Sequence, residues 1–150
     1  MRAVLACLSL VALVGCTALQ PVEVVRVDGL SELSIGRGGI GGELALVINN
    51  PNPVAIAAES VDVELAISGT PVGQVQLPYA QSIPQGPNQV LRLSVQAQTT
   101  ALLSVIEANL FRFLAGEEVE VSVKGEVKGS ALGIAVGIPV DSKQNMKIQL

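Results

Sequence analysis

The glycine-rich segment Gly36-Arg37-Gly38-Gly39-Ile40-Gly41 matches the G-x-G-x-x-G pattern of dinucleotide-binding loops. Such a loop binds pyrophosphate only where a strand precedes it and a helix follows, because the helix N-terminus supplies the amide groups. Residues 43–48 alternate apolar and polar side chains as a strand does. We therefore interpret the segment as a flexible loop between two strands.

Two pairs of carboxylates could support acid–base chemistry. Asp62 and Glu64 share one face of a predicted strand, and Glu118 and Glu120 share one face of another. Catalysis by two carboxylates needs a concave site that separates their pKa values. Placement at i and i+2 on an alternating strand is instead typical of a face in water. We expect both pairs to be solvent-exposed.

Composition excludes further classes of chemistry. The 150 residues contain no His, so there is no imidazole for proton transfer or metal ligation. The sequence has no Gly-x-Ser-x-Gly elbow, no Cys/His cluster and no calcium-loop pattern. A net charge of −4 with only one Tyr, two Phe and no Trp argues against a nucleic-acid partner. We expect no catalytic residues, no cofactor and no metal site.

Cys16 is the residue for which the sequence predicts covalent chemistry. Met1-Arg2 is followed by an uncharged apolar stretch that ends at Gly15 and is too short to span a bilayer. This stretch fits the hydrophobic region of a secretory signal. Leu13-Val14-Gly15-Cys16 resembles the bacterial lipobox, in which the Cys becomes an acylated N-terminus. Two or three acyl chains anchor a protein stably, whereas one chain is marginal.

The lipobox divides the chain into a signal peptide (1–15), an acylated Cys with a short tether (16–21) and a folded domain (22–150). The alternative is an ordinary cleavable signal or an uncleaved anchor, with Cys16 an incidental thiol. The position, the apolar stretch and the four residues together favour the lipoprotein. We expect a bacterial cell-envelope protein whose membrane contact is the lipid anchor at Cys16. Thr17, rather than Asp, resembles outer-membrane sorting in diderm bacteria.

The sequence of the folded domain predicts antiparallel strands with one helix. Period-two alternation predicts half-buried strands, which cover residues 43–48, 60–67, 90–98 and 118–127, with shorter candidates at 23–27, 73–77 and 145–150. Gly and Pro clusters, including 36–42 and 128–130, separate these runs. Residues 100–115 instead predict a helix with Leu102, Ile106, Leu110 and Phe113 on one stripe and Gly116 at its C-terminal cap.

Residues 131–140 lack charge on both faces of a predicted strand. We interpret them as a central strand whose small face receives the helix or a neighbouring loop, since exposed apolar strands promote aggregation. The alternative is an exposed apolar surface for lipid or a partner.

Asn49, Asn50, Pro51, Asn52 and Pro53 are the most distinctive internal motif. Each Pro fixes its own φ and biases the preceding residue toward extended geometry, while Asn side chains can cap the interrupted backbone. The motif predicts a rigid corner between two strands. A ligand site there is the less favoured alternative.

The order of these features resembles the LEA type 2 family, also called the water-stress and hypersensitive-response (WHy) domain. The resemblance rests on a strand, the Asn-Pro corner at Asn49–Pro53, an alternating strand over 60–67 and the turn Gly69-Thr70-Pro71-Val72-Gly73. It implies a small antiparallel β-sandwich of fibronectin type III or immunoglobulin-like form with one helix over residues 22–150. It also implies no catalytic activity and an association with tolerance of desiccation or other stress.

Two functions remain open at this point. The first is a membrane-anchored, non-enzymatic protein that protects the cell envelope during desiccation. The second is a β-sandwich binding module for a lipid, a peptide or an envelope protein. Its candidate mobile edges are residues 36–42, residues 82–88 and the helix near Phe111 and Phe113.

Overall fold

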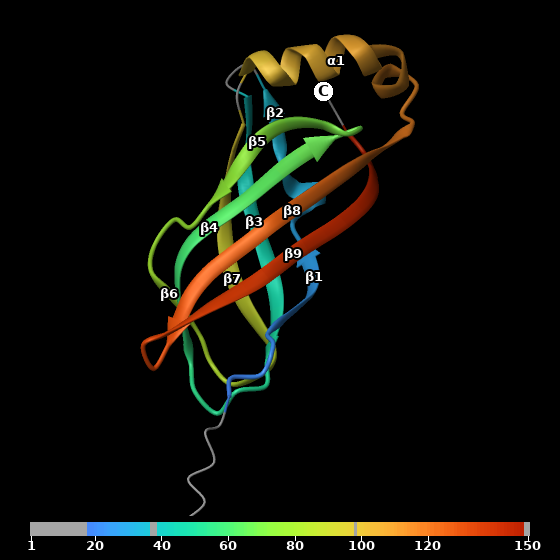
Figure 1. Ribbon diagram of the computed structural model, residues 1–150. Coiled ribbons are helices and arrows are strands. Elements are labelled where there is room, and N and C mark those ends of the chain that lie inside the picture. Colours follow the sequence, from blue (N-terminus) through green and yellow to red (C-terminus); the bar gives the residue numbers. More distant parts are fainter. Residues whose placement is uncertain (1–17, 37–38, 98, 149–150) are drawn as a thin grey trace, which may run out of the picture.

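The structure is a computed structural model that describes residues 18–36, 39–97 and 99–148, and Figure 1 shows its long strands with a single α-helix across one end. The elements are β1 (Glu23–Asp28), the short 3-10 helix η1 (Leu30–Glu32), β2 (Ser34–Gly36), β3 (Gly39–Asn50), β4 (Ile56–Ile67), β5 (Thr70–Gln76), β6 (Gln81–Ile83), β7 (Gly86–Ala97), α1 (Thr99–Leu114), β8 (Glu118–Ala131) and β9 (Ile134–Lys147). The predicted signal peptide and Cys16 lie outside the described residues.

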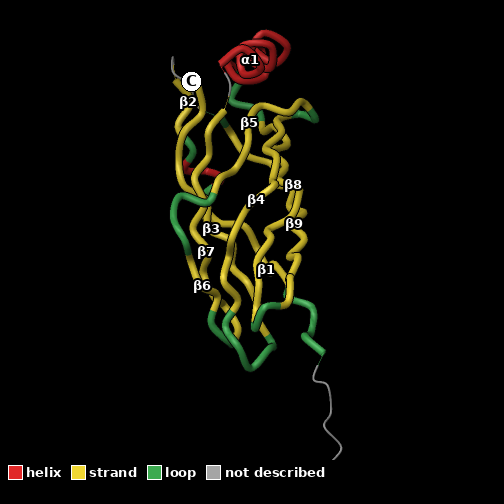
Figure 2. Tube along the Cα trace, turned by 60° about the vertical axis from the view of Figure 1, so that its left-hand side comes forward, coloured by secondary structure: helices red, strands yellow, loops and turns green. Residues whose placement is uncertain are grey.

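All strand pairs are antiparallel and form one continuous sheet in the order β1-β3-β7-β5-β4-β8-β9, with β2 added to β3 and β6 added to β4. The short β5–β7 ladder, Gly73 to Gln76, joins its two halves. The outermost strands face each other, and the Gln144 side chain on β9 donates a hydrogen bond to the Val27 carbonyl on β1 at 2.9 Å. The sheet is therefore nearly closed, as the tube in Figure 2 shows. The prediction of an all-β fold with one helix is confirmed. The finer prediction of a β-sandwich of fibronectin type III or immunoglobulin-like form is not confirmed, because the strands form one continuous sheet.

Alternation along the strands builds an almost wholly aliphatic core. Successive strand side chains point to opposite sides of a sheet, so every second residue enters the interior over residues 63–67 of β4, 91–95 of β7 and 119–123 of β8. The most deeply buried large side chains come from five strands and are Leu44, Leu46, Ile48, Ile56, Leu65, Ile83, Leu91, Leu93 and Ile138. Each contributes about 1.5–3 kcal/mol through removal of its apolar surface from water.

Helix α1 lies across the end of the sheet and packs mainly on β5. Its C-terminus has the predicted cap: Gly116 adopts φ 66° and its N–H donates to the Phe113 carbonyl at 3.0 Å. The predicted stripe is partly wrong, because Val105 is buried and Leu110 is exposed. The helix contacts the sheet along a line rotated from the one that the Leu spacing suggested.

Residues 131–140 do not form one central strand, so that prediction is wrong. Leu132 (φ 52°) and Gly133 (φ 76°) make a two-residue hairpin turn between β8 and β9. The turn leaves Leu132 79% exposed and Ile134 54% exposed. β9 is the last strand of the sheet, and its small residues face outward rather than receiving α1.

One predicted break is wrong, because Gly residues continue β8 through it, and the other, between β2 and β3, is shorter than the predicted 36–42. Residues 39–42 belong to β3, and residues 128–130 lie within β8. At Gly129, an added Cβ would collide with the Ala57 carbonyl oxygen on β4. Gly is needed there for close approach of two backbones and not for a turn.

The molecule has two ends that position its candidate sites (Figure 1). We call the end with α1 the helix end. We call the opposite end the corner end, where β3 gives way to β4 at the Asn-Pro motif and where the first described residues, 18–22, lie. β8 runs its full 14 residues between the two ends.

Candidate functional sites: a buried asparagine corner and an apolar pocket

Asn50 occupies the centre of the corner that joins β3 and β4. Its side chain is fully buried. The Asn50 Nδ2 group lies within hydrogen-bond distance of three carbonyl oxygens, which are those of Val54 at 3.0 Å, Ile83 at 3.1 Å and Pro84 at 3.3 Å. One amide thus connects the corner to the loop between β6 and β7, where backbone acceptors would otherwise be buried without donors.

Asn52 extends this network to the N-terminal segment. Its own N–H and its Nδ2 group both donate to Asn50 Oδ1, at 3.0 and 3.1 Å. Its Oδ1 accepts from the Gln20 N–H at 2.6 Å, and its Nδ2 group donates to the Gln20 carbonyl at 2.9 Å. The amide therefore pairs with the Gln20 backbone as a neighbouring strand would, and fixes where the chain enters the domain.

The remaining motif residues surround these two amides. Asn49 is half-buried, Pro51 is half-buried and Pro53 is exposed. The two prolines lie between the end of β3 and the start of β4, where they cannot remove a ladder hydrogen bond. The site is structural in its chemistry, because both buried amides are occupied by protein groups.

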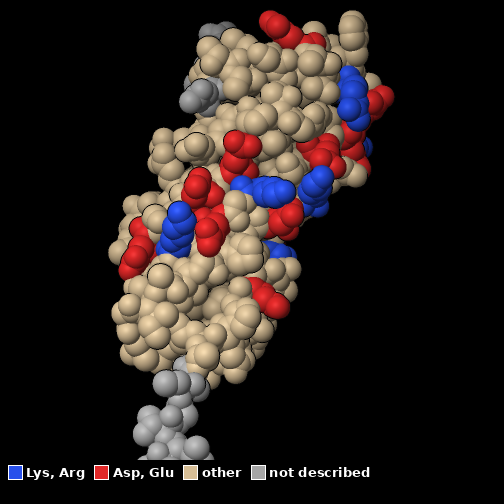
Figure 3. Space-filling model, viewed as in Figure 1, with Lys and Arg blue, Asp and Glu red and all other residues tan. Residues whose placement is uncertain are grey.

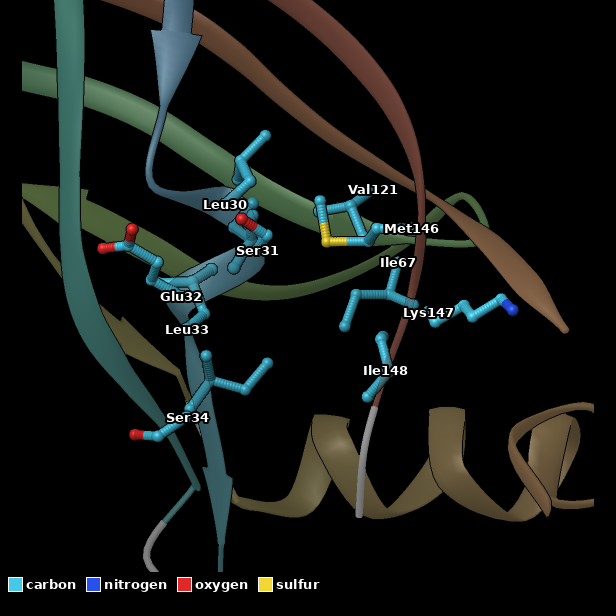
Figure 4. A pocket seen from close by; sticks show the side chains of 12 residues that line it. Leu30, Ser31, Glu32, Leu33, Ser34, Ile67, Val121, Met146, Lys147 and Ile148 are labelled. Atoms are coloured by element: carbon cyan, nitrogen blue, oxygen red, sulfur yellow. The ribbon is translucent and has the colours of Figure 1, made fainter. Parts of the chain in front are cut away.

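An apolar pocket of about 510 Å³ opens at the helix end, above the Gln144–Val27 hydrogen bond between β9 and β1. One wall is η1 with the residues leading into β2. The other comprises the last residues of β9 with the parts of β4 and β8 that lie at the helix end (Figure 4). Its lining residues are Leu30, Ser31, Glu32, Leu33, Ser34, Ile40, Leu65, Ile67, Val121, Met146, Lys147 and Ile148. The volume falls within the range of small-molecule sites, about 300–1,000 Å³.

The pocket offers apolar contact rather than acid–base chemistry. Figure 4 shows the Glu32 carboxylate and the Lys147 ammonium pointing away from the space, in opposite directions. Leu65, Ile67 and Val121 are buried beneath it. Ser31 and Ser34 add polar surface beside this apolar floor, so the lining suits a largely aliphatic or aromatic ligand that also carries a polar group.

The predicted carboxylate pairs lie on the outer face of the sheet. Asp62, Glu64, Glu118 and Glu120 are all exposed. Glu120 faces Lys143 on the neighbouring strand at 3.7 Å. This arrangement is a solvated strand face with cross-strand charge pairs, as the sequence indicated.

The glycine-rich segment leads from β2 into β3, so a strand follows it where a dinucleotide site would need a helix. The Ser34 hydroxyl donates to the Gly41 carbonyl across this hairpin at 3.0 Å. Within residues 18–36, 39–97 and 99–148, no three carboxylates or other metal-ligating side chains gather as a metal site requires. Over the same residues, no helix is long and apolar enough to cross a membrane.

Helix α1 turns a row of apolar side chains outward. Phe111 is 86% exposed, and Leu103 and Leu114 are exposed beside it. Phe113, which the sequence placed at the same candidate edge, is instead buried against the sheet. Of the two Phe residues, only Phe111 is available on the surface.

Comparisons with known proteins agree with this architecture. The model of the family described as "Late embryogenesis abundant protein" (LEA type 2) matches residues 45–144. A protein of Archaeoglobus fulgidus, solved by crystallography, superposes with a TM-score of 0.54 at 12% identity over 89% of this chain and 99% of its own. A protein of Arabidopsis thaliana, solved in solution, superposes with a TM-score of 0.55 at 14% identity over 89% of this chain and 85% of its own. The comparison with curated proteins gives no significant match.

Proposed function

Because this chain belongs to the LEA type 2 family of late embryogenesis abundant proteins, we propose that it is a non-enzymatic lipoprotein that protects a bacterial cell envelope during desiccation or other stress. The match to the family over residues 45–144 supports the protective role, and the lipobox-like sequence Leu13-Val14-Gly15-Cys16 supports the anchor. The folded domain supplies a stable acidic surface, and acyl chains on Cys16 hold it at the membrane. The outer membrane is the favoured location in a diderm bacterium, because Thr17 follows Cys16.

The point at which the chain enters the domain fits the proposed tether. The chain enters the domain at Gln20, where Asn52 holds its backbone through two hydrogen bonds. Gln20 is only four residues from Cys16. An anchor at Cys16 would therefore hold the domain next to the membrane surface.

The Cys16→Ala variant tests the anchor and the protective role together. We expect it to leave the membrane fraction, because the thiol that would carry diacylglycerol is gone, and to reduce survival after drying to that of a deletion strain. Fractionation, intact-protein mass and survival counts measure these effects. The control is Cys7→Ala, which removes the chain's other thiol from within the predicted signal.

The proposed anchor and the proposed protection fail separately in this experiment. Wild-type protein without lipid mass, or Cys16→Ala protein that stays in the membrane fraction, would contradict the anchor. Survival that is unchanged in both the variant and the deletion strain would remove the protective role and leave the anchor in place.

A second candidate function is a binding module for a lipid, peptide or envelope partner, and the apolar pocket at the helix end specifically favours an apolar ligand. Its volume of about 510 Å³ and its buried floor of Leu65, Ile67 and Val121 give such a ligand a place to leave water. Under this second proposal the protein would sequester or carry the ligand, and α1 would lie beside the opening of the pocket (Figure 4).

The Ser31→Trp variant tests the pocket. Ser31 lines the pocket and is exposed, so a Trp there narrows the space at little cost to the core. We expect about a tenfold loss of affinity for a fluorescent fatty acid, which corresponds to about 1.4 kcal/mol. Thr70→Trp, which places the same side chain at an exposed position on β5, is the control. Equal affinity in the two variants, or no binding by the wild type, would count against the pocket.

A further inference from the structure

The corner end of the domain carries no charge. It is made of four segments, residues 18–22, 49–58, 81–91 and 129–136, and none of the chain's nine Lys and Arg or thirteen Asp and Glu residues falls in them. Figure 3 shows the same division on one face of the molecule, where charged side chains lie over the middle and the helix end and the corner end is bare of them. The nearest charges in the sequence are Glu23, Glu59, Arg92 and Lys128, where these segments leave the corner end, and the Ser130 hydroxyl donates a hydrogen bond to the Glu59 carboxylate.

The corner end also presents apolar side chains to solvent. The β8–β9 hairpin projects Leu132 (79% exposed) and Ile134 (54% exposed), and Val90 is exposed near the start of β7. A hairpin tip that carries two large aliphatic residues is unusual, because turns of this type ordinarily use Asn or Gly. The combination of exposed aliphatic groups and absent charge is what a surface needs to enter a bilayer interface without desolvating ions.

The short segment between Cys16 and Gln20 determines which end of the domain lies next to the membrane. Gln20 is fixed at the corner end by Asn52, with the Gln20 N–H 2.6 Å from Asn52 Oδ1 and the Gln20 carbonyl 2.9 Å from Asn52 Nδ2. Gln20 is the fourth residue after Cys16, and a fully extended chain over four residue steps spans at most about 14 Å. An acylated Cys16 would therefore keep the corner end, and not the helix end, within reach of the headgroups. The 14 residues of β8 place the helix end about 40 Å away along the strand.

We propose that the corner end docks on the bilayer to which Cys16 is anchored, with the Leu132–Ile134 hairpin tip inserted into the interfacial layer. This proposal rests on the anchoring proposed above. Its attraction is apolar rather than electrostatic, because the corner end has no Lys or Arg to bind anionic headgroups and the chain has a net charge of −4. Docking holds the sheet upright and turns α1 and the apolar pocket away from the membrane.

The absence of Trp from the chain provides a direct test. Single Trp variants at Ile134 and at Leu132 each place the only indole at the hairpin tip. Phe111→Trp is the control, because Phe111 is also exposed and apolar but lies at the helix end. The full-length lipoprotein is reconstituted into phosphatidylcholine vesicles, and Trp emission is quenched with aqueous acrylamide and with lipids brominated on their acyl chains.

For Ile134→Trp and Leu132→Trp we expect a blue-shifted emission, quenching by brominated lipid and at least about a twofold loss of acrylamide quenching, because interfacial insertion buries groups about 5–10 Å deep. Phe111→Trp should remain accessible to acrylamide. The result should be the same when phosphatidylglycerol is added. Three results would overturn the docking. They are equal quenching at the tip and at residue 111, deeper burial of residue 111 than of the tip, and quenching at the tip that depends on phosphatidylglycerol.

Failure of the anchor is distinguishable from failure of the docking. Sedimentation of the same samples reports whether the protein stays on the vesicles. Protein that does not co-sediment overturns the anchor and the docking with it. Protein that co-sediments with an exposed tip overturns the docking alone.

Discussion

Replacing Asn50 by Ala is expected to lower the free energy of unfolding by about 3–4 kcal/mol and the melting temperature by about 10 °C. The change leaves the carbonyl oxygens of Val54, Ile83 and Pro84 without their donor and removes the acceptor of both Asn52 bonds. Buried polar groups without partners cost about 1–3 kcal/mol each. Thermal and urea denaturation measure the effect.

Asn50→Asp separates the loss of donors from the loss of volume. Asp has nearly the same shape but places a carboxylate oxygen against the three carbonyl oxygens, so we expect it to destabilise at least as much as Ala. Asn49→Ala is the matched control, because Asn49 is only half-buried in the same motif. An Asn50→Asp variant as stable as the wild type would show that the hydrogen bonds donated by Asn50 Nδ2 contribute little to the free energy of unfolding.

Replacing Gly125 by Ala is expected to destabilise the domain by about 3–5 kcal/mol, because it combines backbone strain with a collision. Gly125 has φ 152° and lies in the middle of β8, opposite Val63 on β4 and Val140 on β9. An added Cβ would overlap the Asp62 carbonyl oxygen of the neighbouring strand. The two longest ladders of the sheet would both have to shift.

The control for Gly125→Ala is Gly41→Ala. Gly41 lies in β3, its φ is not in the left-handed region, and the nearest atom to an added Cβ is Ser34 Oγ at 4.0 Å. We expect its stability to change by no more than about 1 kcal/mol, since Ala also reduces the entropy of the unfolded chain. Equal melting temperatures for the two variants would show that the β4–β8 contact is not close-packed.

The strands were predictable because their alternation reports burial directly. Every second residue is buried over residues 63–67 of β4, 91–95 of β7 and 119–123 of β8, and the sequence shows that period in each stretch without help from the rest of the chain. The bulge between Ala58 and Ser60, which changes the alternation in β4, has no such signal. The helix was predictable for a similar reason, but its rotation was not. Whether Val105 or Leu110 faces the sheet depends on the angle at which α1 crosses β5, which is a tertiary property.

The hairpin at Leu132 and Gly133 was missed because its local signal is weak. A two-residue turn needs positive φ at both positions, and Leu is a poor residue for that backbone. The alternating faces of residues 131 to 140 looked continuous across it. The exposed tip corresponds to the alternative that the sequence had left open, a surface for lipid or a partner.

The candidate sites depend on residues that are distant in sequence, which limits what a single sequence can predict. The Asn-Pro motif predicts a corner from local sequence alone. The carbonyl oxygens of Ile83 and Pro84 that accept from Asn50, however, lie 33 and 34 residues away in the sequence. The pocket exists because the sheet stops short of closure between β2 and β9. A sandwich and a nearly closed sheet differ here mainly in the four-residue ladder between β5 and β7, which no local pattern specifies.

The approach of β1 to β9 has a consequence for life at low water content. Drying crowds proteins together, and an unpaired strand border is where neighbouring molecules begin to polymerise into fibrils. Here the two borders face inward toward each other and carry Arg26, Lys143 and Lys147 along their length. A molecule built this way keeps the borders of its two outermost long strands, β1 and β9, away from its neighbours when evaporation concentrates it.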